Sequence, residues 1–156
     1  MKRERILITG STGAIGREIA NAVSREGASV FLHCRDSAEE MGSLKFSCEE
    51  RGSKAHAKLS DLSKPGEPEL LVDEAASRMG GIDALIHCAS IFKKSIVGEV
   101  TDDAWNEMMS INLKASFFIA QSTGMKMRDL GGSIVMMSDV ASTRPYAGYL
   151  PYCISK

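Results

Sequence analysis

The 156-residue chain has only four cysteines, and their spacing suggests neither a metal site nor a redox motif. Cys34, Cys48, Cys88 and Cys153 include no C-x-x-C pair, and no histidine lies at metal-ligand spacing from any of them. Isolated cysteines of this kind are typical of reduced thiols in a cytoplasmic protein. We therefore expect a cytoplasmic location and no bound metal.

The sequence also lacks a long apolar run and an excess of charge of one sign. The apolar run over residues 6–8 is too short for a signal peptide. No stretch approaches the roughly 20 apolar residues that a membrane span needs. The net charge is −1 at pH 7, so no overall field favours nucleic acid or an anionic membrane. These absences favour a small-molecule partner, with no nucleic acid and no membrane.

Patterns typical of strands and of helices alternate along the sequence, and its length suits one domain over residues 1–156. Short apolar runs predict strands over 6–9, 28–34, 54–59, 84–87 and 133–137. Helical spacing of apolar residues predicts helices over 14–25, 37–50, 70–79 and, less evenly, 102–127. Residues 140–151 are expected to form a loop. This alternation predicts right-handed crossovers and an α/β Rossmann fold, a doubly wound parallel sheet in three α/β/α layers.

A glycine-rich turn separates the first strand from the first helix. Gly10, Gly13 and Gly16 follow the spacing G-x-x-G-x-x-G. A dinucleotide pyrophosphate needs close backbone approach and the N–H groups of a helix N-terminus, and this turn would supply both. A tight helix–sheet contact alone is the alternative, but the βαβ context favours cofactor binding. The predicted contacts are Gly10, Ser11, Thr12, Gly13, Ile15 and Gly16.

Tyr152 and Lys156 form a Y-x-x-x-K pair after the fifth strand. On a helix, residues four apart share a face, so the ammonium would lie near the phenol. A cation stabilises the phenolate and should lower the tyrosine pKa from about 10 toward the working range. The pair suits protonation of a carbonyl or imine while hydride arrives from a nicotinamide.

Together these motifs resemble the short-chain dehydrogenase/reductase family, whose turn is T-G-x-x-x-G-x-G; here Ala14 replaces the middle glycine. The resemblance makes Tyr152 and Lys156 catalytic and adds Asn112, in the long helix, as part of a proton relay. Asn112 could instead be a helix residue whose polar groups are satisfied locally.

The resemblance also implies which dinucleotide binds. The family position that contacts the ribose is Cys34, which is neutral, and Arg35 and Ser37 follow it. An arginine can pair with a 2′-phosphate, whereas an acidic residue would repel it. Asp36 would oppose the phosphate if it pointed inward, and Arg35 could be a solvated loop residue. We expect NADP(H), with Asp61 and Leu62 at the adenine; Asp61 could instead be a turn residue.

One branch of the family, the pteridine reductases, is similar in further details. Asp139 stands where most members have the catalytic serine, thirteen residues before Tyr152, and Ser138 lies one place too early. His87-Cys88-Ala89-Ser90 replaces the usual N-N-A-G, and the branch carries A-S at the last two positions. The similarity implies that Ala89 and Ser90 contact the cofactor and that Phe92 stacks on a pterin. Arg17, at the start of the first helix, is expected near the phosphates beside the substrate, and it could instead be an exposed helix arginine. Asp139 could also be a surface or relay aspartate in another carbonyl reductase.

The resemblance covers only the first part of the family's usual length, because Lys156 is the last residue. A family member continues through two more strands and a substrate loop. We therefore expect a longer protein or a second chain to complete the site, and the fold to be incomplete after strand five, with an open apolar edge. We expect weak cofactor binding and no turnover from the isolated chain. The family implies a homodimer or homotetramer at full length.

Three functions remain open. The first is an NADPH-dependent reductase of a pterin or a similar C=N or C=O compound. The second is a reductase of a 3-oxoacyl thioester or another ketone. The third is a dinucleotide-binding sensor or scaffold without chemistry, against which the joint presence of Asn112, Tyr152 and Lys156 argues.

Overall fold

The computed structural model describes residues 4–156 as a parallel five-stranded sheet between layers of helices. The strand order is β3-β2-β1-β4-β5, and all neighbouring strands run parallel. The reversal of order on either side of β1 makes the sheet doubly wound, as predicted. The strands are β1 (Arg5–Thr9), β2 (Ser29–Cys34), β3 (Ala55–Leu59), β4 (Ala84–His87) and β5 (Ser133–Met136).

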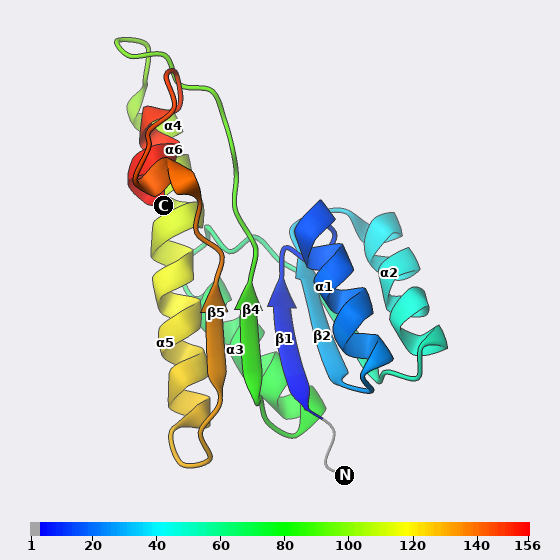
Figure 1. Cartoon of the computed structure of the whole chain (residues 1–156). Coiled ribbons are helices and arrows are strands. Elements are labelled where there is room, and N and C mark those ends of the chain that lie inside the picture. Colours follow the sequence, from blue (N-terminus) through cyan, green and yellow to red (C-terminus); the bar gives the residue numbers. More distant parts are fainter. Residues whose placement is uncertain (1–3) are drawn as a thin grey trace.

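Helices cover both faces of this sheet (Figure 1). Helices α1 (Ala14–Arg25) and α2 (Ala38–Glu50) pack on one face, around a core that includes Ile8, Val30 and Leu44. Helices α3 (Glu67–Met79) and α5 (Ser116–Met127) cover the other, around Leu7 and Ile119. The three-layer Rossmann prediction is confirmed.

The long predicted helix over 102–127 is broken in the middle. It consists of α4 (Asp102–Met109), one π-helical stretch, η1 (Ser110–Ala115), and α5. A π turn adds a residue to the helical repeat and is frequent at functional sites. Asn112 lies inside this stretch, so the expected unevenness of the helix coincides with a predicted site residue.

Two predicted boundaries were wrong near prolines. Helix α3 begins at Glu67 rather than residue 70. Backbone N–H groups in the first turn of a helix have no acceptor within the helix, so the missing N–H of Pro68 costs nothing there. The predicted loop over 140–151 contains a short 3₁₀ turn, η2 (Val140–Ser142), and α6 (Leu150–Ser155) already begins within it. Pro151 stands in the first turn of α6 for the same reason.

The end of the chain folds back over the carboxyl ends of the strands. Helix α6 lies beside α4 above β5 (Figure 1), and a small separate core of Met108, Ala141, Tyr152 and Cys153 joins them. This arrangement places Tyr152 and Lys156 at the strand ends. Among residues 4–156, no helix combines the length and the apolar character that crossing a membrane requires.

Candidate active site

A pocket opens at the carboxyl ends of β1, β2, β3 and β4, which we call the carboxyl-end pocket. Such a position beside a reversal of strand order is where open parallel sheets bind ligands. Nine of the twelve predicted cofactor residues line it: Gly10, Thr12, Gly13, Arg35, Ser37, Asp61, Leu62, Ala89 and Ser90.

The glycine-rich turn is packed too tightly to tolerate side chains at two positions. Gly10 has φ of +62°, and a Cβ there would come within 2.7 Å of the Ala89 nitrogen. A Cβ on Gly16 would overlap the Gly10 carbonyl oxygen. A left-handed backbone and close approach are both reasons for glycine. The turn therefore presents bare backbone to the carboxyl-end pocket.

Three residues predicted to contact the cofactor do not line this pocket. Ser11 is buried, and its backbone N–H and its hydroxyl both donate to the carbonyl of His33, at 2.9 and 3.0 Å. Ile15 is largely exposed on α1, and Gly16 is buried behind Gly10. The role of Ser11 is to fasten the turn to β2, since its donors are used there.

Arg17, predicted near the phosphates, also lies outside the lining of the pocket. Its guanidinium is 3.4 Å from the carbonyl oxygen of Thr12 and 3.8 Å from the carboxylate of Glu40. The side chain thus bends back over the glycine turn toward α2, which places its charge beside the turn rather than in the pocket.

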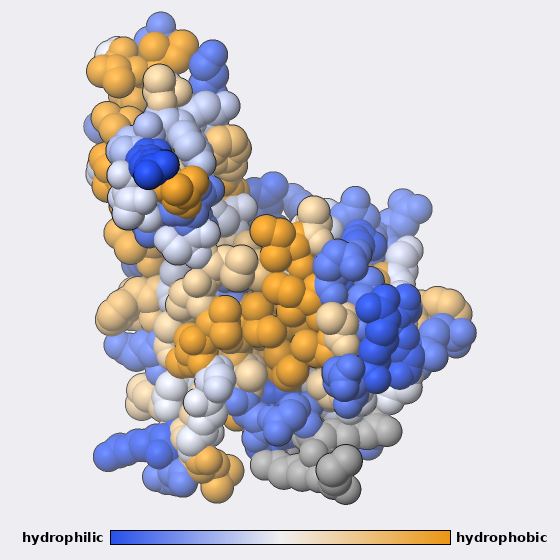
Figure 2. Space-filling model, in the orientation of Figure 1, coloured by the Kyte–Doolittle hydropathy of each residue, from blue (hydrophilic) through white to orange (hydrophobic). Residues whose placement is uncertain are grey.

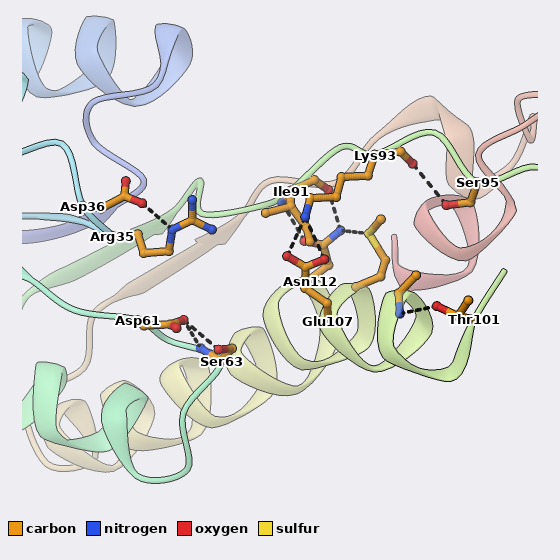
Figure 3. A network of polar contacts seen from close by, with 12 residues as sticks. Arg35, Asp36, Asp61, Ser63, Ile91, Lys93, Ser95, Thr101, Glu107 and Asn112 are labelled. Carbon is orange, nitrogen blue, oxygen red and sulfur yellow. Dashed lines mark hydrogen bonds and ion pairs between the residues drawn. The ribbon is translucent and has the colours of Figure 1, made fainter.

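An ion pair lies in the wall of the pocket, directly after the end of β2. Arg35 and Asp36 form an exposed ion pair at 2.9 Å (Figure 3), which raises the pKa of Arg35. Across the pocket, Asp61 accepts from the hydroxyl and backbone N–H of Ser63, at 2.7 and 3.0 Å. These bonds lower the pKa of Asp61. Asp61 therefore lies in the pocket and is also the turn aspartate of the alternative interpretation.

Five further residues line the pocket and were not predicted as contacts: His33, Ser60, Cys88, Ile91 and Ile111. His33 and Ser60 stand at or just after strand ends, and the rule that strand ends meet at one edge could have found them. Ile111 comes from the π turn, and no pattern in the sequence marks it.

The Tyr152 hydroxyl donates a hydrogen bond of 2.6 Å to the Asp139 carboxylate. The carboxylate also accepts from the backbone N–H of Ala141 at 2.8 Å and from the Tyr146 hydroxyl at 3.3 Å. Its pKa is therefore lowered, chiefly by the bond from Tyr152. Asp139 thus lies directly at the Tyr152 phenol, and its catalytic role stays a prediction.

The expected lowering of the Tyr152 pKa is wrong for this structure. Burial and the acceptor carboxylate of Asp139 raise the pKa of Tyr152, since both favour the neutral phenol. The Lys156 ammonium lies 5.7 Å from the centre of the tyrosine ring and donates to the carbonyl of Met137 at 3.2 Å. Burial lowers the pKa of Lys156, and Asp139 opposes that effect.

Ser138 does not take the place of the family serine. Its hydroxyl donates to the backbone carbonyl of Lys156 at 3.2 Å, so it holds the end of α6 rather than the phenol of Tyr152. The sequence prediction that Ser138 lies one place too early agrees with this contact.

Asn112 connects the π turn to the loop after β4. Its side-chain oxygen accepts from Ile91 N–H at 2.8 Å, and its amide donates to the Ile91 carbonyl at 2.9 Å (Figure 3). The amide also lies 3.0 Å from the hydroxyl of Ser155, the neighbour of Lys156. Asn112 is buried and fully engaged, and it reaches α6 beside the tyrosine–lysine pair.

Phe92 stands between two tyrosines. Its ring stacks on Tyr149 with centroids 4.3 Å apart and planes inclined by 2°, and it meets Tyr152 edge-on at 4.6 Å. The side chain is still 56% exposed. An exposed aromatic surface thus lies directly beside the phenol of Tyr152.

Comparisons with known proteins agree with this geometry. The family model described as short chain dehydrogenase matches residues 4–156. Gluconate 5-dehydrogenase of Gluconobacter oxydans is 33% identical over 156 residues, covering 97% of this chain and 59% of that protein. The 3beta-hydroxysteroid dehydrogenase of Mediterraneibacter gnavus is 33% identical over 153 residues, covering 97% of this chain and 55% of that protein.

Solved structures with either dinucleotide are similar too. A short chain dehydrogenase from Burkholderia cenocepacia in complex with NADP has a TM-score of 0.92 at 31% identity, covering 98% of this chain and 62% of that one. The NADH-dependent reductase A1-R′ complexed with NAD has a TM-score of 0.93 at 26% identity, covering 99% and 67%. The chain spans less than two thirds of the length of the two curated relatives. From its fold, its glycine turn and the match over residues 4–156, this chain belongs to the short-chain dehydrogenase/reductase family.

Proposed function

We propose that the protein carrying this chain is an NADP(H)-dependent oxidoreductase that reduces a pterin or a similar C=N or C=O compound. The observation that carries the proposal is the Tyr152 phenol, bonded at 2.6 Å to Asp139 and flanked by Lys156. Tyr152 contacts Phe92, which directly follows residues 88–91 in the wall of the carboxyl-end pocket, and the charge of Lys156 acts on Cys88 in that wall. Residues 1–156 would form the dinucleotide-binding part.

The chain's residues supply the proton of such a reduction. A reduced nicotinamide, when bound, supplies the hydride. Asp139 holds the Tyr152 phenol protonated, and Tyr152 donates that proton to the nitrogen or oxygen of the substrate. Lys156 then stabilises the phenolate that remains. Hydride and proton together make the two-electron reduction.

The pocket fits a dinucleotide at its glycine turn. Bare backbone at Gly10 and the buried Gly16 allow close approach of a pyrophosphate to the start of α1. The preference for NADP(H) rests on neutral Cys34 and on Arg35 and Ser37, all of which line the pocket. Similar structures hold NAD or NADP, so the choice depends on these side chains.

The pterin proposal rests on Asp139 and Phe92. An aspartate at the serine position keeps the phenol in its protonated form, and an exposed phenylalanine beside that phenol suits a flat ring. The second candidate is a ketone or alcohol substrate, which the names of the two curated relatives favour. A homodimer or homotetramer is also proposed, supported by exposed Trp105, Leu113 and Phe117 on the helix that the family implies for assembly.

Substitution of Phe92 separates the two substrate classes. In the full-length protein with NADPH, Phe92→Leu should lower kcat/KM for a 7,8-dihydropterin by about 10-fold, because ring stacking is lost. Turnover of a ketone substrate should change little. Ile96→Ala, at another exposed apolar residue of the same loop, is the matched control and should leave both unchanged.

The outcomes decide between the hypotheses. Equal losses for both substrates would remove the pterin proposal and leave the ketone reductase. If neither substrate is reduced and Tyr152→Phe gives the same result as the wild type in the turnover assay, the sensor or scaffold remains.

A further inference from the structure

His87 is the last residue of β4, which lies between β1 and β5, and it is buried, with 3% of its surface exposed. Its Nδ1 lies 2.7 Å from the Thr9 hydroxyl, at the end of β1. Its Nε2 lies 2.8 Å from the Ser116 hydroxyl, at the start of α5. The ring therefore spans the gap between the strand that leads into the glycine turn and the helix that follows the π turn.

The directions of these hydrogen bonds follow from their partners. The Ser116 hydroxyl donates to the Asn112 carbonyl at 2.6 Å, a group that can only accept. Ser116 must then accept from His87, which places the ring proton on Nε2. Nδ1 is left as an acceptor, and the Thr9 hydroxyl donates to it. Thr9 in turn accepts from the backbone N–H of Ala89 at 3.3 Å.

The result is one continuous chain of hydrogen bonds with every donor matched to an acceptor. It runs from Ala89, against which Gly10 is packed, through Thr9, His87 and Ser116 to Asn112. A charged imidazole would break it, because it has no acceptor for the Thr9 hydroxyl. Burial and the charge of Lys156 lower the pKa of His87 to about 4, so the ring is neutral at pH 7.

We infer that His87 is a positioning residue that couples the dinucleotide-binding turn to Asn112 through a neutral ring protonated on Nε2. The Thr9 side fixes Ala89 against Gly10 in the carboxyl-end pocket. The Ser116 side fixes the carbonyl of Asn112, whose side chain in turn holds Ile91 and Ser155. The turnover readout rests on the proposed function, whereas the tautomer and the binding readouts do not.

The tautomer can be measured directly. In the full-length protein, ¹⁵N labelling of histidine gives one pair of imidazole signals for each histidine, and His33, His56 and His87 are three of these. At pH 7 we expect His87 to show a protonated Nε2 and an unprotonated Nδ1. A charged ring or the opposite tautomer would overturn the inference, and no variant is needed for this result.

Two substitutions divide the chain of hydrogen bonds into its halves. In His87→Asn, the side-chain amide reaches only to the position of Nδ1. This variant therefore keeps the hydrogen bond with Thr9 and loses the one with Ser116. In His87→Gln, the side-chain amide reaches the position of Nε2. This variant therefore keeps the hydrogen bond with Ser116 and loses the one with Thr9. Ser116→Ala and Thr9→Val remove the same two links from the other side.

The expected effects separate accordingly. In the full-length protein, His87→Asn and Ser116→Ala should each lower kcat by about 5- to 10-fold with little change in the Kd for NADP. His87→Gln and Thr9→Val should raise that Kd by about 5- to 10-fold. Combining His87→Asn with Ser116→Ala should be no worse than His87→Asn alone, because both break one link.

Additive losses in this double variant would show that the two residues act separately and would overturn the coupling. If Thr9→Val folds and its Kd for NADP is unchanged, the inferred link from His87 through Thr9 to the glycine-rich turn is overturned. If no reductase activity exists, the tautomer and the Kd values still decide the inference, and the failure then belongs to the proposed function.

Discussion

At the scale of single residues, the proposed preference for NADP(H) depends on Arg35. Its guanidinium lines the carboxyl-end pocket and is paired with Asp36 at 2.9 Å. Arg35→Ala should raise the Kd for NADPH by about 10-fold or more and leave that for NADH within about 2-fold, because only NADPH offers a phosphate to a charged donor. Fluorescence titration measures both constants.

Arg51 provides the control for this prediction. It is exposed at the end of α2, where its guanidinium bonds to Ser47, and it lies outside the lining of the pocket. Arg51→Ala should leave both constants unchanged. An equal loss of NADH and NADPH binding in Arg35→Ala would mean that Arg35 contacts a group common to both.

Two buried histidines make stability depend on pH. Burial lowers the pKa values of His33 and His87 to about 4, whereas an unfolded histidine titrates near 6.5. The unfolded chain therefore binds more protons between these values, so the free energy of unfolding falls as pH drops from about 6.5 to about 4. Each histidine contributes a loss on the order of 3 kcal/mol at the end of this window.

Urea unfolding at several pH values between 7 and 4 measures this slope. In His87→Gln, one of the two buried imidazoles is gone, and the slope should be smaller by up to one proton. A free energy of unfolding that stays constant from pH 7 to 4.5 in the wild type would contradict the assignment.

Helix α1 depends on the glycine at its start. Gly16→Ala would drive a methyl group into the Gly10 carbonyl and within 2.8 Å of the Ser11 Cα, so the turn must move. We expect a loss of dinucleotide binding together with a lower Tm. Binding titration and thermal unfolding check the two effects.

Gly42 offers the matched substitution in the neighbouring helix. It lies within α2, and a Cβ there would meet nothing within 4 Å. Gly42→Ala should raise the stability by up to about 1 kcal/mol, because alanine favours a helix, and it should leave binding unchanged. A harmless Gly16→Ala would show that the turn has more room than its packing indicates.

At the scale of the whole molecule, the edge of the sheet formed by β5 carries an exposed apolar surface. Strand β5 pairs with β4 at one edge of the sheet, and Ile134, Val135 and Met136 are 40%, 47% and 40% exposed. Figure 2 shows an apolar patch over this part of the sheet, next to α1 and on the same face of the sheet as that helix. This matches the open apolar edge predicted from the sequence, and such an edge favours pairing with other chains.

We predict that the 156-residue chain associates with itself as its concentration rises. Val135→Lys should reduce this association, because a charge opposes edge pairing. Leu59→Lys, on β3 at the other edge of the sheet, is the control and should have less effect. Sedimentation velocity over a range of concentrations measures it, and a wild-type chain that stays monomeric throughout would refute the prediction.

The sequence by itself determined the sheet, its helices and the glycine turn. Apolar runs and helical spacing depend on neighbouring residues, so local patterns were enough to place β1 to β5 and most of the helix boundaries. The same holds for Tyr152 and Lys156, because residues four apart share a helical face wherever the helix lies.

Only the tertiary structure decided which predicted residues meet and what they do. Ser11 points to His33 rather than into the pocket, and His87 links two distant elements, because these contacts join parts of the chain 22 to 78 residues apart. The proton of Tyr152 is held by Asp139, which lowers its acidity where the lysine spacing had predicted the opposite. A pKa depends on burial and on distances in space, and neither is written in the spacing of residues along the chain.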